Sequence, residues 1–175
     1  ATKSVHLDSS SFHVDGEYAA KSAGENPVVP VISITHGYSR DHRADLKQFV
    51  VDLMCSSDGD IPLYLRVADG NESDKAVFAQ LMEQFQAQLS FDALFVADSA
   101  LYSQENLQAL SGLRWLSRVP ATLSEAKEYL QDTPDAAFVT SCLTGYRIAR
   151  AQSYYGGVEQ RWLIVESQKR KASDI

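Results

Sequence analysis

The sequence predicts a mixed α/β fold that ends in a strand-rich tail, and three observations support this. A period-two pattern opens the chain, which is typical of β-strands. An amphipathic stretch at 73–89 and a continuous apolar run at 93–97 then begin an alternation of helices and strands. After Pro134 only strand-like runs follow. An antiparallel three-stranded start that passes into helix-connected strands indicates one mixed sheet.

The first part of the chain is expected to form strands only. Residues 4–18 alternate around Val5 and Leu7, and a short strand is expected at 31–34. Residues 47–55 have two interpretations, because their apolar side chains also suit one face of a helix. The run is short, however, and a turn at 56–60 leads from it into the apolar run that ends at Val67, so we interpret the two runs as a β-hairpin.

Helices and strands are expected to alternate between residues 71 and 133. Asn71 can cap the helix at 73–89, and the run at 93–97 is interpreted as a central strand buried on both faces. The remaining elements are a helix that Ser103 caps and Gly112 ends, a strand at 113–119, and a helix to Leu130 opened by a capping box of Thr122 and Glu125.

The tail predicts a separate all-β part. Strands are expected at 138–139, 146–149 and 162–165, with a turn around Gly156. We therefore expect two domains, a core at 1–133 and a β-rich insertion at 134–175. The chain starts without Met and ends soon after Lys169-Arg170-Lys171 with no closing element, so we expect it to be a piece of a longer protein.

Composition excludes several classes of protein. The 175 residues are 45% apolar and 22% charged, which is ordinary for a soluble globular protein, and no apolar run is long enough for a membrane span. The net charge of −7 argues against a nonspecific nucleic-acid binder, whose surface should be basic. Cys55 and Cys142 are 87 positions apart, so we expect two buried thiols in a reducing compartment rather than a disulfide or a zinc site.

Two aspartates occupy positions where chemistry is expected. Asp8 lies inside the first strand, where an unpaired carboxylate is costly, and Asp98 ends the apolar run at 93–97. If the two strands are neighbours, the carboxylates converge and form a hard oxygen site for Mg²⁺ or Mn²⁺. The alternative is structural: Asp8 starts a polar bend and Asp98 caps the helix that follows.

Five motifs in order carry a family resemblance: LDSSSFHVDGEY, ITHGYSRDHRADLKQ, RVADGNESD, LFVADSALYS and RWLSRVP. Over about residues 4 to 130 the chain resembles the DDE transposase domain of bacterial insertion sequences, in the insertion sequence four superfamily. The resemblance implies an RNase H-like fold with Asp8 and Asp98 as the first two catalytic acids. With a glutamate, these would hold two divalent metal ions, Mg²⁺ or Mn²⁺. It further implies DNA partners (transposon ends and target), a homodimer, and a bacterial, cytoplasmic, nucleoid-associated location.

The third acid of the family has no match in the chain. It should lie on a late helix, whereas Glu159 and Glu166 flank an apparent strand and are rejected. We therefore expect the third acid outside this chain, which alone would be inactive in DNA cleavage. Two alternatives stay open, a non-catalytic RNase H-like binding or assembly module and another RNase H-like nuclease.

Two basic clusters are candidates for DNA binding. Arg40, His42 and Arg43 lie in the motif GYSRDHRAD, and Lys169 and Arg170 lie near the end of the chain. The alternatives are a solvated loop with local ion pairs for the first cluster and a solvated terminus for the second.

Overall fold

A computed structural model describes residues 3–18, 31–38, 42–89 and 92–173. The chain divides into two compact units, Ala1–Arg118 and Val119–Ile175. The boundary between them lies before the expected domain boundary, because the helix that precedes residue 133 groups with the tail. The assignment of a catalytic core and an insertion to 1–133 and 134–175 stays a prediction.

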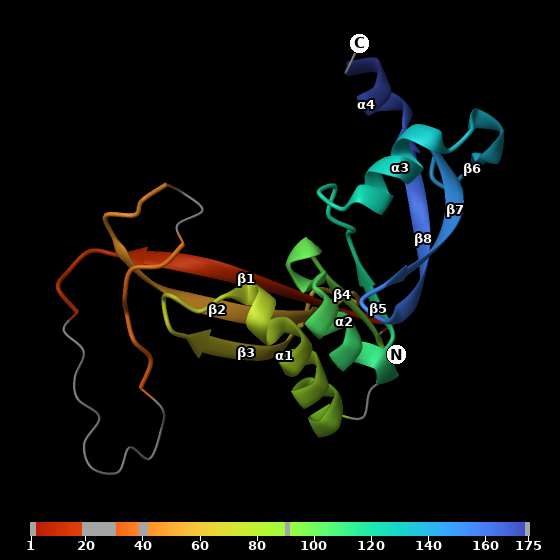
Figure 1. Ribbon diagram of the computed structural model, residues 1–175. Helices are drawn as coiled ribbons and strands as arrows, with labels where there is room; N and C mark the ends of the chain where they lie inside the picture. The colour runs from red at the N-terminus through yellow and green to blue at the C-terminus, as the bar shows by residue number, and fades with distance from the viewer. Residues whose placement is uncertain (1–2, 19–30, 39–41, 90–91, 174–175) are drawn as a thin grey trace. The chain divides into compact units, whose positions relative to one another are not determined.

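A five-stranded mixed sheet organises the first unit, as predicted. Its strand order is β3-β2-β1-β4-β5, which places β1 at the centre (Figure 1). The three antiparallel strands are β1 (Ser4–Val14), β2 (Lys47–Ser56) and β3 (Pro62–Ala68). The parallel strands are β4 (Leu94–Ala97) and β5 (Trp115–Ser117), joined to the rest through β1.

Helical segments connect the parallel strands. Helix α1 (Asp74–Leu89) precedes β4, and two 3₁₀ turns, η1 (Ser99–Leu101) and η2 (Leu110–Gly112), flank the short α2 (Gln104–Ala109) before β5. Ser103 caps α2 as predicted, since its Oγ accepts a hydrogen bond from the Asn106 N–H at 3.3 Å.

The core of the first unit lies between the sheet and α1. Its buried side chains come from both elements and from the segments beside β4: Val5, Leu7, Met54, Phe78, Leu81, Met82, Phe85, Phe95, Leu101 and Leu110. Phe85 of α1 meets Phe95 of β4 edge to face, with ring centroids 6.1 Å apart. The opposite side of the sheet, which we call the open face, carries exposed side chains: His6, Asp8, Ser10, Phe12, Leu65, Val67 and Leu116.

The second unit is a three-stranded antiparallel sheet, β6-β7-β8, with helices at its ends. In chain order its elements are α3 (Ser124–Asp132), η3 (Asp135–Ala137), β6 (Val139–Thr140), β7 (Tyr146–Tyr155), β8 (Val158–Ser167) and α4 (Gln168–Ser173). Tyr129 of α3 packs on Trp162 of β8, with centroids 5.7 Å apart, and its hydroxyl donates to the Gln152 carbonyl at 2.7 Å.

Several sequence predictions were wrong in detail. Val31–Ile34 is not a strand; only Thr35 bridges to Gln48 of β2. No side-chain hydrogen bond from Thr122 caps α3, whose N-cap is Leu123. Strand β4 is buried on one face only, since Val96 is half-exposed.

The end of the chain and the cysteines also differ from expectation. Strands β7 and β8 of the tail are longer than predicted, and helix α4 follows them. Both cysteines are free, as predicted, but neither is buried: Cys142 is exposed and Cys55 is half-exposed on β2. The spacing of the two cysteines in the sequence reveals neither which face of β2 Cys55 occupies nor that Cys142 lies in an exposed bend.

Candidate metal-binding site

The register between β1 and β4 relates the two candidate aspartates. Ser4, Val5 and His6 pair in parallel with Leu94, Phe95 and Val96. Asp8 and Asp98 both lie two residues beyond the last of these pairs, so the same register would place them opposite one another. Neighbouring strands are about 4.8 Å apart. The condition on which the sequence argument depended, that the first and fourth strands are neighbours, is met.

The alternation of side chains along the two strands would also place both aspartates on one face of the sheet. Side chains alternate along β1, so Asp8 lies on the open face between the buried Leu7 and Ser9. The backbone of Asp98 is still extended (φ −72°, ψ −174°), and its side chain is exposed too. Both carboxylates are exposed, and the continued register would make them accessible from the same side of the sheet.

Asp98 also has the structural role that was its alternative interpretation. Its Oδ1 accepts a hydrogen bond from the Ala100 N–H at 2.8 Å and caps η1. Among the described residues, Oδ2 of Asp98 has no hydrogen-bond partner, and Ser117 Oγ donates to the Asp98 carbonyl at 2.7 Å. Capping through one oxygen orients the carboxylate and leaves the second available, so the two roles are compatible.

A third ligand is missing from the part of the chain that the structure describes. Those residues contain no group of three or more His, Cys, Asp or Glu side chains able to hold a metal ion. Glu166 is engaged by Arg147 Nε at 2.8 Å and by Lys171 Nζ at 2.9 Å. These two cations, Arg147 first, lower the pKa of Glu166 to about 2. Its place in an ion-pair network agrees with rejecting it as the third acid.

A buried carboxylate that sequence reasoning missed lies behind Asp8. Asp52 of β2 is almost fully buried on the covered face and accepts hydrogen bonds from Ser9 Oγ and from Arg66 Nη1. Burial raises its pKa, against the opposing effects of Ser9 and Arg66. The signal was available, because Asp52 interrupts an apolar strand just as Asp8 does.

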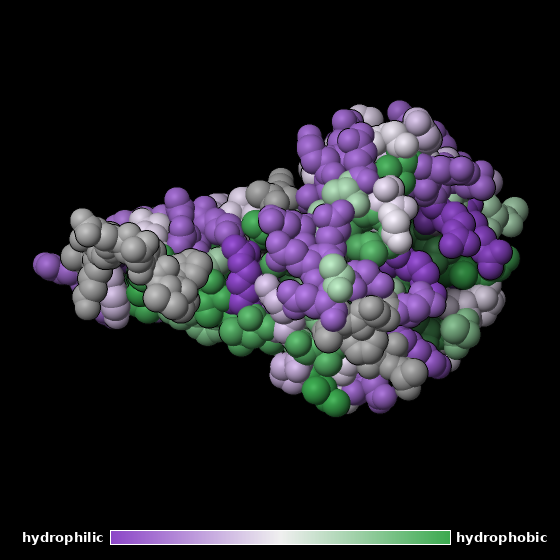
Figure 2. All heavy atoms as spheres, turned by 90° about the horizontal axis from the view of Figure 1, so that it is seen from below, coloured by the Kyte–Doolittle hydropathy of each residue, from purple (hydrophilic) through white to green (hydrophobic). Residues whose placement is uncertain are grey.

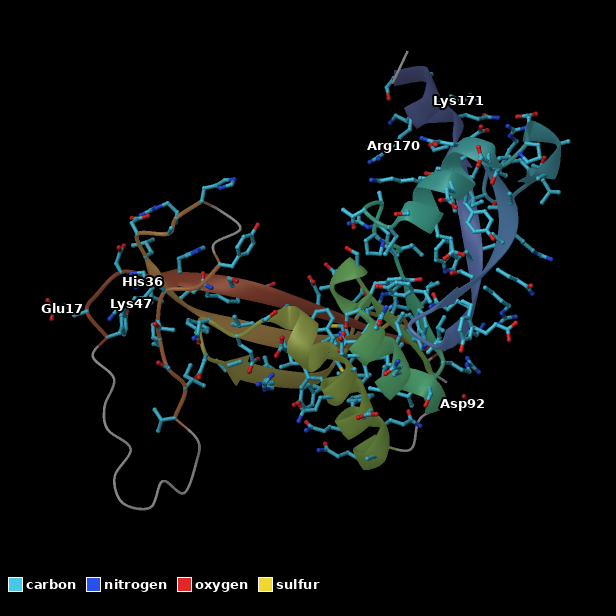
Figure 3. The ribbon with its side chains drawn as sticks, viewed as in Figure 1. Glu17, His36, Lys47, Asp92, Arg170 and Lys171 are labelled. Atoms are coloured by element: carbon cyan, nitrogen blue, oxygen red, sulfur yellow. The ribbon has the colours of Figure 1, made fainter. Side chains whose placement is uncertain are left out.

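The first basic cluster lies far from the aspartates. Arg40 is outside the described residues. His42 and Arg43 are exposed just before β2, whose first residue pairs with Val14, six residues beyond Asp8 and thus about 20 Å along β1. Arg43 forms an ion pair with Asp45 at 2.9 Å, which fits the solvated-loop alternative. Figure 3 shows Glu17, His36 and Lys47 at this end of the hairpin, where Lys47 Nζ donates to the Glu17 carbonyl.

The second basic cluster lies on α4. Lys169 and Arg170 are exposed and have no acidic partner among the residues described, whereas Lys171 pairs with Glu166. In Figure 3 the labelled Arg170 and Lys171 lie on this short helix.

The space-filling view in Figure 2 shows hydrophilic and hydrophobic residues interspersed on the face it presents. No helix in the described ranges has the length and apolar character needed to cross a bilayer.

The sequence model of the transposase DDE domain family matches residues 5–170. Similar solved structures include a Mos1 transposase paired-end complex with the left transposon end (16% identity, TM-score 0.42, covering 70% of this chain and 37% of that one). Another is a Mos1 mariner paired-end complex with Mn (16%, 0.42, covering 75% and 41%). The chain thus spans about two fifths of the length of these proteins. No curated protein sequence matches the chain.

Proposed function

Because the chain belongs to the transposase DDE domain family, we propose that it is a catalytic segment of a DNA transposase that cleaves and joins phosphodiesters at transposon ends. The observation that carries the proposal is the register of β1 and β4. It would set Asp8 beside Asp98 on one exposed face, at the strand ends where open α/β sheets bind ligands. The insertion sequence four superfamily is the finer assignment that we propose.

The donor set of this site fits a hard divalent cation. Both side chains supply carboxylate oxygens, which Mg²⁺ and Mn²⁺ prefer, and both are exposed. We propose that Asp8 and Asp98 are ligands shared by two Mg²⁺ or Mn²⁺ ions in the complete site. Such cations activate the attacking oxygen and stabilise the leaving oxygen of a phosphodiester. The protein's part is to hold the two carboxylates side by side, with the Ala100 N–H orienting that of Asp98.

The chain alone is proposed to be inactive in cleavage. Two carboxylates are fewer than the family's three, and the described residues offer no third ligand. We propose that the third acid lies outside these 175 residues. The same observation favours the second candidate function, a binding or assembly module that kept the fold without the chemistry.

DNA is the proposed partner, in the form of transposon ends and target. The exposed Lys169 and Arg170 support contact with phosphates, and His42 and Arg43 with Arg40 are the weaker candidates because Arg43 is paired with Asp45. We also propose a homodimer, because two transposon ends must be brought together. A bacterial, cytoplasmic location near the nucleoid belongs to the same proposal.

Manganese binding by the 175-residue chain tests the proposal. We expect electron paramagnetic resonance to detect one class of Mn²⁺ site, and Asp8→Asn and Asp98→Asn each to weaken it by about tenfold or more. Asp58→Asn is the matched control, because Asp58 is exposed in the β2–β3 turn away from the proposed site. Unchanged binding in Asp8→Asn and Asp98→Asn would contradict the metal site. No binding in the unmodified chain would favour the non-catalytic module.

A further inference from the structure

A row of polar side chains crosses three strands directly behind Asp8. Ser9 pairs with Asp52 in the β1–β2 ladder, and Asp52 pairs with Arg66 in the β2–β3 ladder. Ser9 Oγ donates to Asp52 Oδ1, and Arg66 Nη1 donates to Asp52 Oδ2 at 3.0 Å. Arg66 Nη2 then reaches Glu72, just before α1, at 2.6 Å. The row is therefore continuous from β1 to the entry of α1.

Stability alone does not account for this row. The side chain of Asp52 is only 1% exposed, and the rows on either side of it on the covered face include Leu7 with Met54, and Val50 with Ala68. Replacing a buried ion pair with apolar residues often leaves stability unchanged or raises it, because no charges then have to be desolvated. Buried polar contacts of this kind are best attested as devices that select one register.

The register of β1 on β2 decides which face of the sheet Asp8 occupies. The neighbouring serines, Ser9 to Ser11, offer little apolar pattern to align β1 on β2, and a slip by one residue would turn Asp8 toward the core. The β1–β4 ladder stops at His6. Beyond it, the position of Asp8 depends on β2, and Ser9 is the next residue along the chain.

We infer that Ser9, Asp52 and Arg66 are positioning residues that hold Asp8 beside Asp98, rather than contributors to stability alone. The inference rests on the proposed function for its consequence, the affinity of the site for a divalent cation. The mechanism is local: the Ser9–Asp52 hydrogen bond clamps the backbone of β1 one residue from the ligand. Arg66 donates to Asp52, and Glu72 pairs with Arg66 in turn, so the two side chains orient Asp52 as the acceptor.

Ser9→Ala is the variant that tests the clamp. It removes the hydroxyl but leaves Asp52 paired with Arg66, so the fold is retained. We expect the Mn²⁺ dissociation constant to rise about 5-fold, somewhat less than for loss of a residue that bonds a ligand directly. Ser9→Thr, which keeps the hydroxyl, should restore affinity. Ser11→Ala is the matched control, because Ser11 is two residues further along the same face, opposite Val50.

A second readout does not depend on metal binding. In a chain with Cys55→Ala and Cys142→Ser, the pair Asp8→Cys and Asp98→Cys should form a disulfide under mild oxidation, because neighbouring strand positions bring the Cβ atoms close. Adding Ser9→Ala should slow that reaction about 5-fold, the same factor as for Mn²⁺. Adding Ser11→Ala should not slow it.

The two readouts separate this inference from the proposed function. If the unmodified chain binds no Mn²⁺ but the cysteine pair closes and slows with Ser9→Ala, the positioning role stands and the metal site fails. If Ser9→Ala lowers only the thermal midpoint and leaves both the Mn²⁺ affinity and the disulfide rate within about twofold, the row is merely structural and the inference is wrong. A cysteine pair that does not close at all also overturns it.

Discussion

Replacing Gly70 with alanine is predicted to destabilise the first unit strongly. Gly70 belongs to the turn between β3 and α1, and its N–H donates to the Ser33 carbonyl at 3.0 Å. A Cβ at this position would lie 2.6 Å from the Thr35 carbonyl oxygen and closer still to that of Gln48. Both atoms belong to the backbone and cannot rotate away, so the turn itself must move.

The size of the effect follows from the contacts that the movement breaks. A shift of about 1 Å, needed to restore an ordinary carbon–oxygen contact, would disrupt the bond from Gln48 Nε2 to the Gly70 carbonyl (2.6 Å) and the bond from the Gly70 N–H to Ser33. Each hydrogen bond is worth about 1 kcal/mol, and overpacking adds about 1–3 kcal/mol. We expect a loss of about 3 kcal/mol, or about 10 °C in thermal midpoint.

Urea and thermal unfolding followed by circular dichroism measure this loss. Gly112→Ala is the control, because the Cβ that it would add meets no atom within 4 Å outside the adjoining backbone. It should change the free energy of unfolding by less than about 0.5 kcal/mol. If Gly70→Ala also stays within about 0.5 kcal/mol of the unmodified chain, the backbone crossing at this turn is not as tight as described, and the reasoning fails.

Two further predictions concern the core and the second unit. Phe85→Ala should cost about 3–5 kcal/mol in urea unfolding, because Phe85 is fully buried between α1 and the sheet; a loss under about 1 kcal/mol would contradict this packing. The pKa of Glu166 is lowered to about 2 from its usual 4.5, chiefly by Arg147, so its stabilising contribution is complete above pH 4.5 and is lost as the pH falls toward 2. Glu166→Gln should make the stability of the second unit depend less on pH in that window. Carbon-13 NMR of the Glu166 carboxyl measures its pKa directly, and a titration near pH 4.5 would refute the prediction.

The fold could be predicted where the spacing of the apolar residues and the positions of the turn residues indicated the same elements. The hairpin of β2 and β3 was recognised because the turn at 56–60 separates two apolar runs, and α1 because its apolar stripe has helical spacing. The failures have physical causes as well. Val31–Ile34 has strand-forming residues, but pairing depends on a partner strand, and only Thr35 meets β2.

The candidate site could be predicted only in part. The convergence of Asp8 and Asp98 depends on the pairing of β1 with β4, which the sequence left as a condition because helix connections do not fix which strands are neighbours. Asp52 shows what the sequence leaves open. It interrupts its apolar strand as Asp8 does, yet it faces the core and Asp8 faces solvent. The position of α1 decides which face of each strand is covered. The pattern of a single strand does not reveal the covered face when both faces carry apolar residues.

The distribution of charge sharpens the argument about DNA. Residues 119–175 carry as many basic as acidic side chains, so the whole net charge of −7 belongs to residues 1–118. The acidic excess, which argues against nonspecific nucleic-acid binding, is therefore concentrated in the unit that holds Asp8, Asp98 and Asp52. Phosphates would approach that unit against its own field unless cations offset the carboxylates. On the proposed function, the same divalent cations that serve the chemistry also make the surface acceptable to DNA. The balanced second unit carries exposed basic side chains, Lys169 and Arg170 among them.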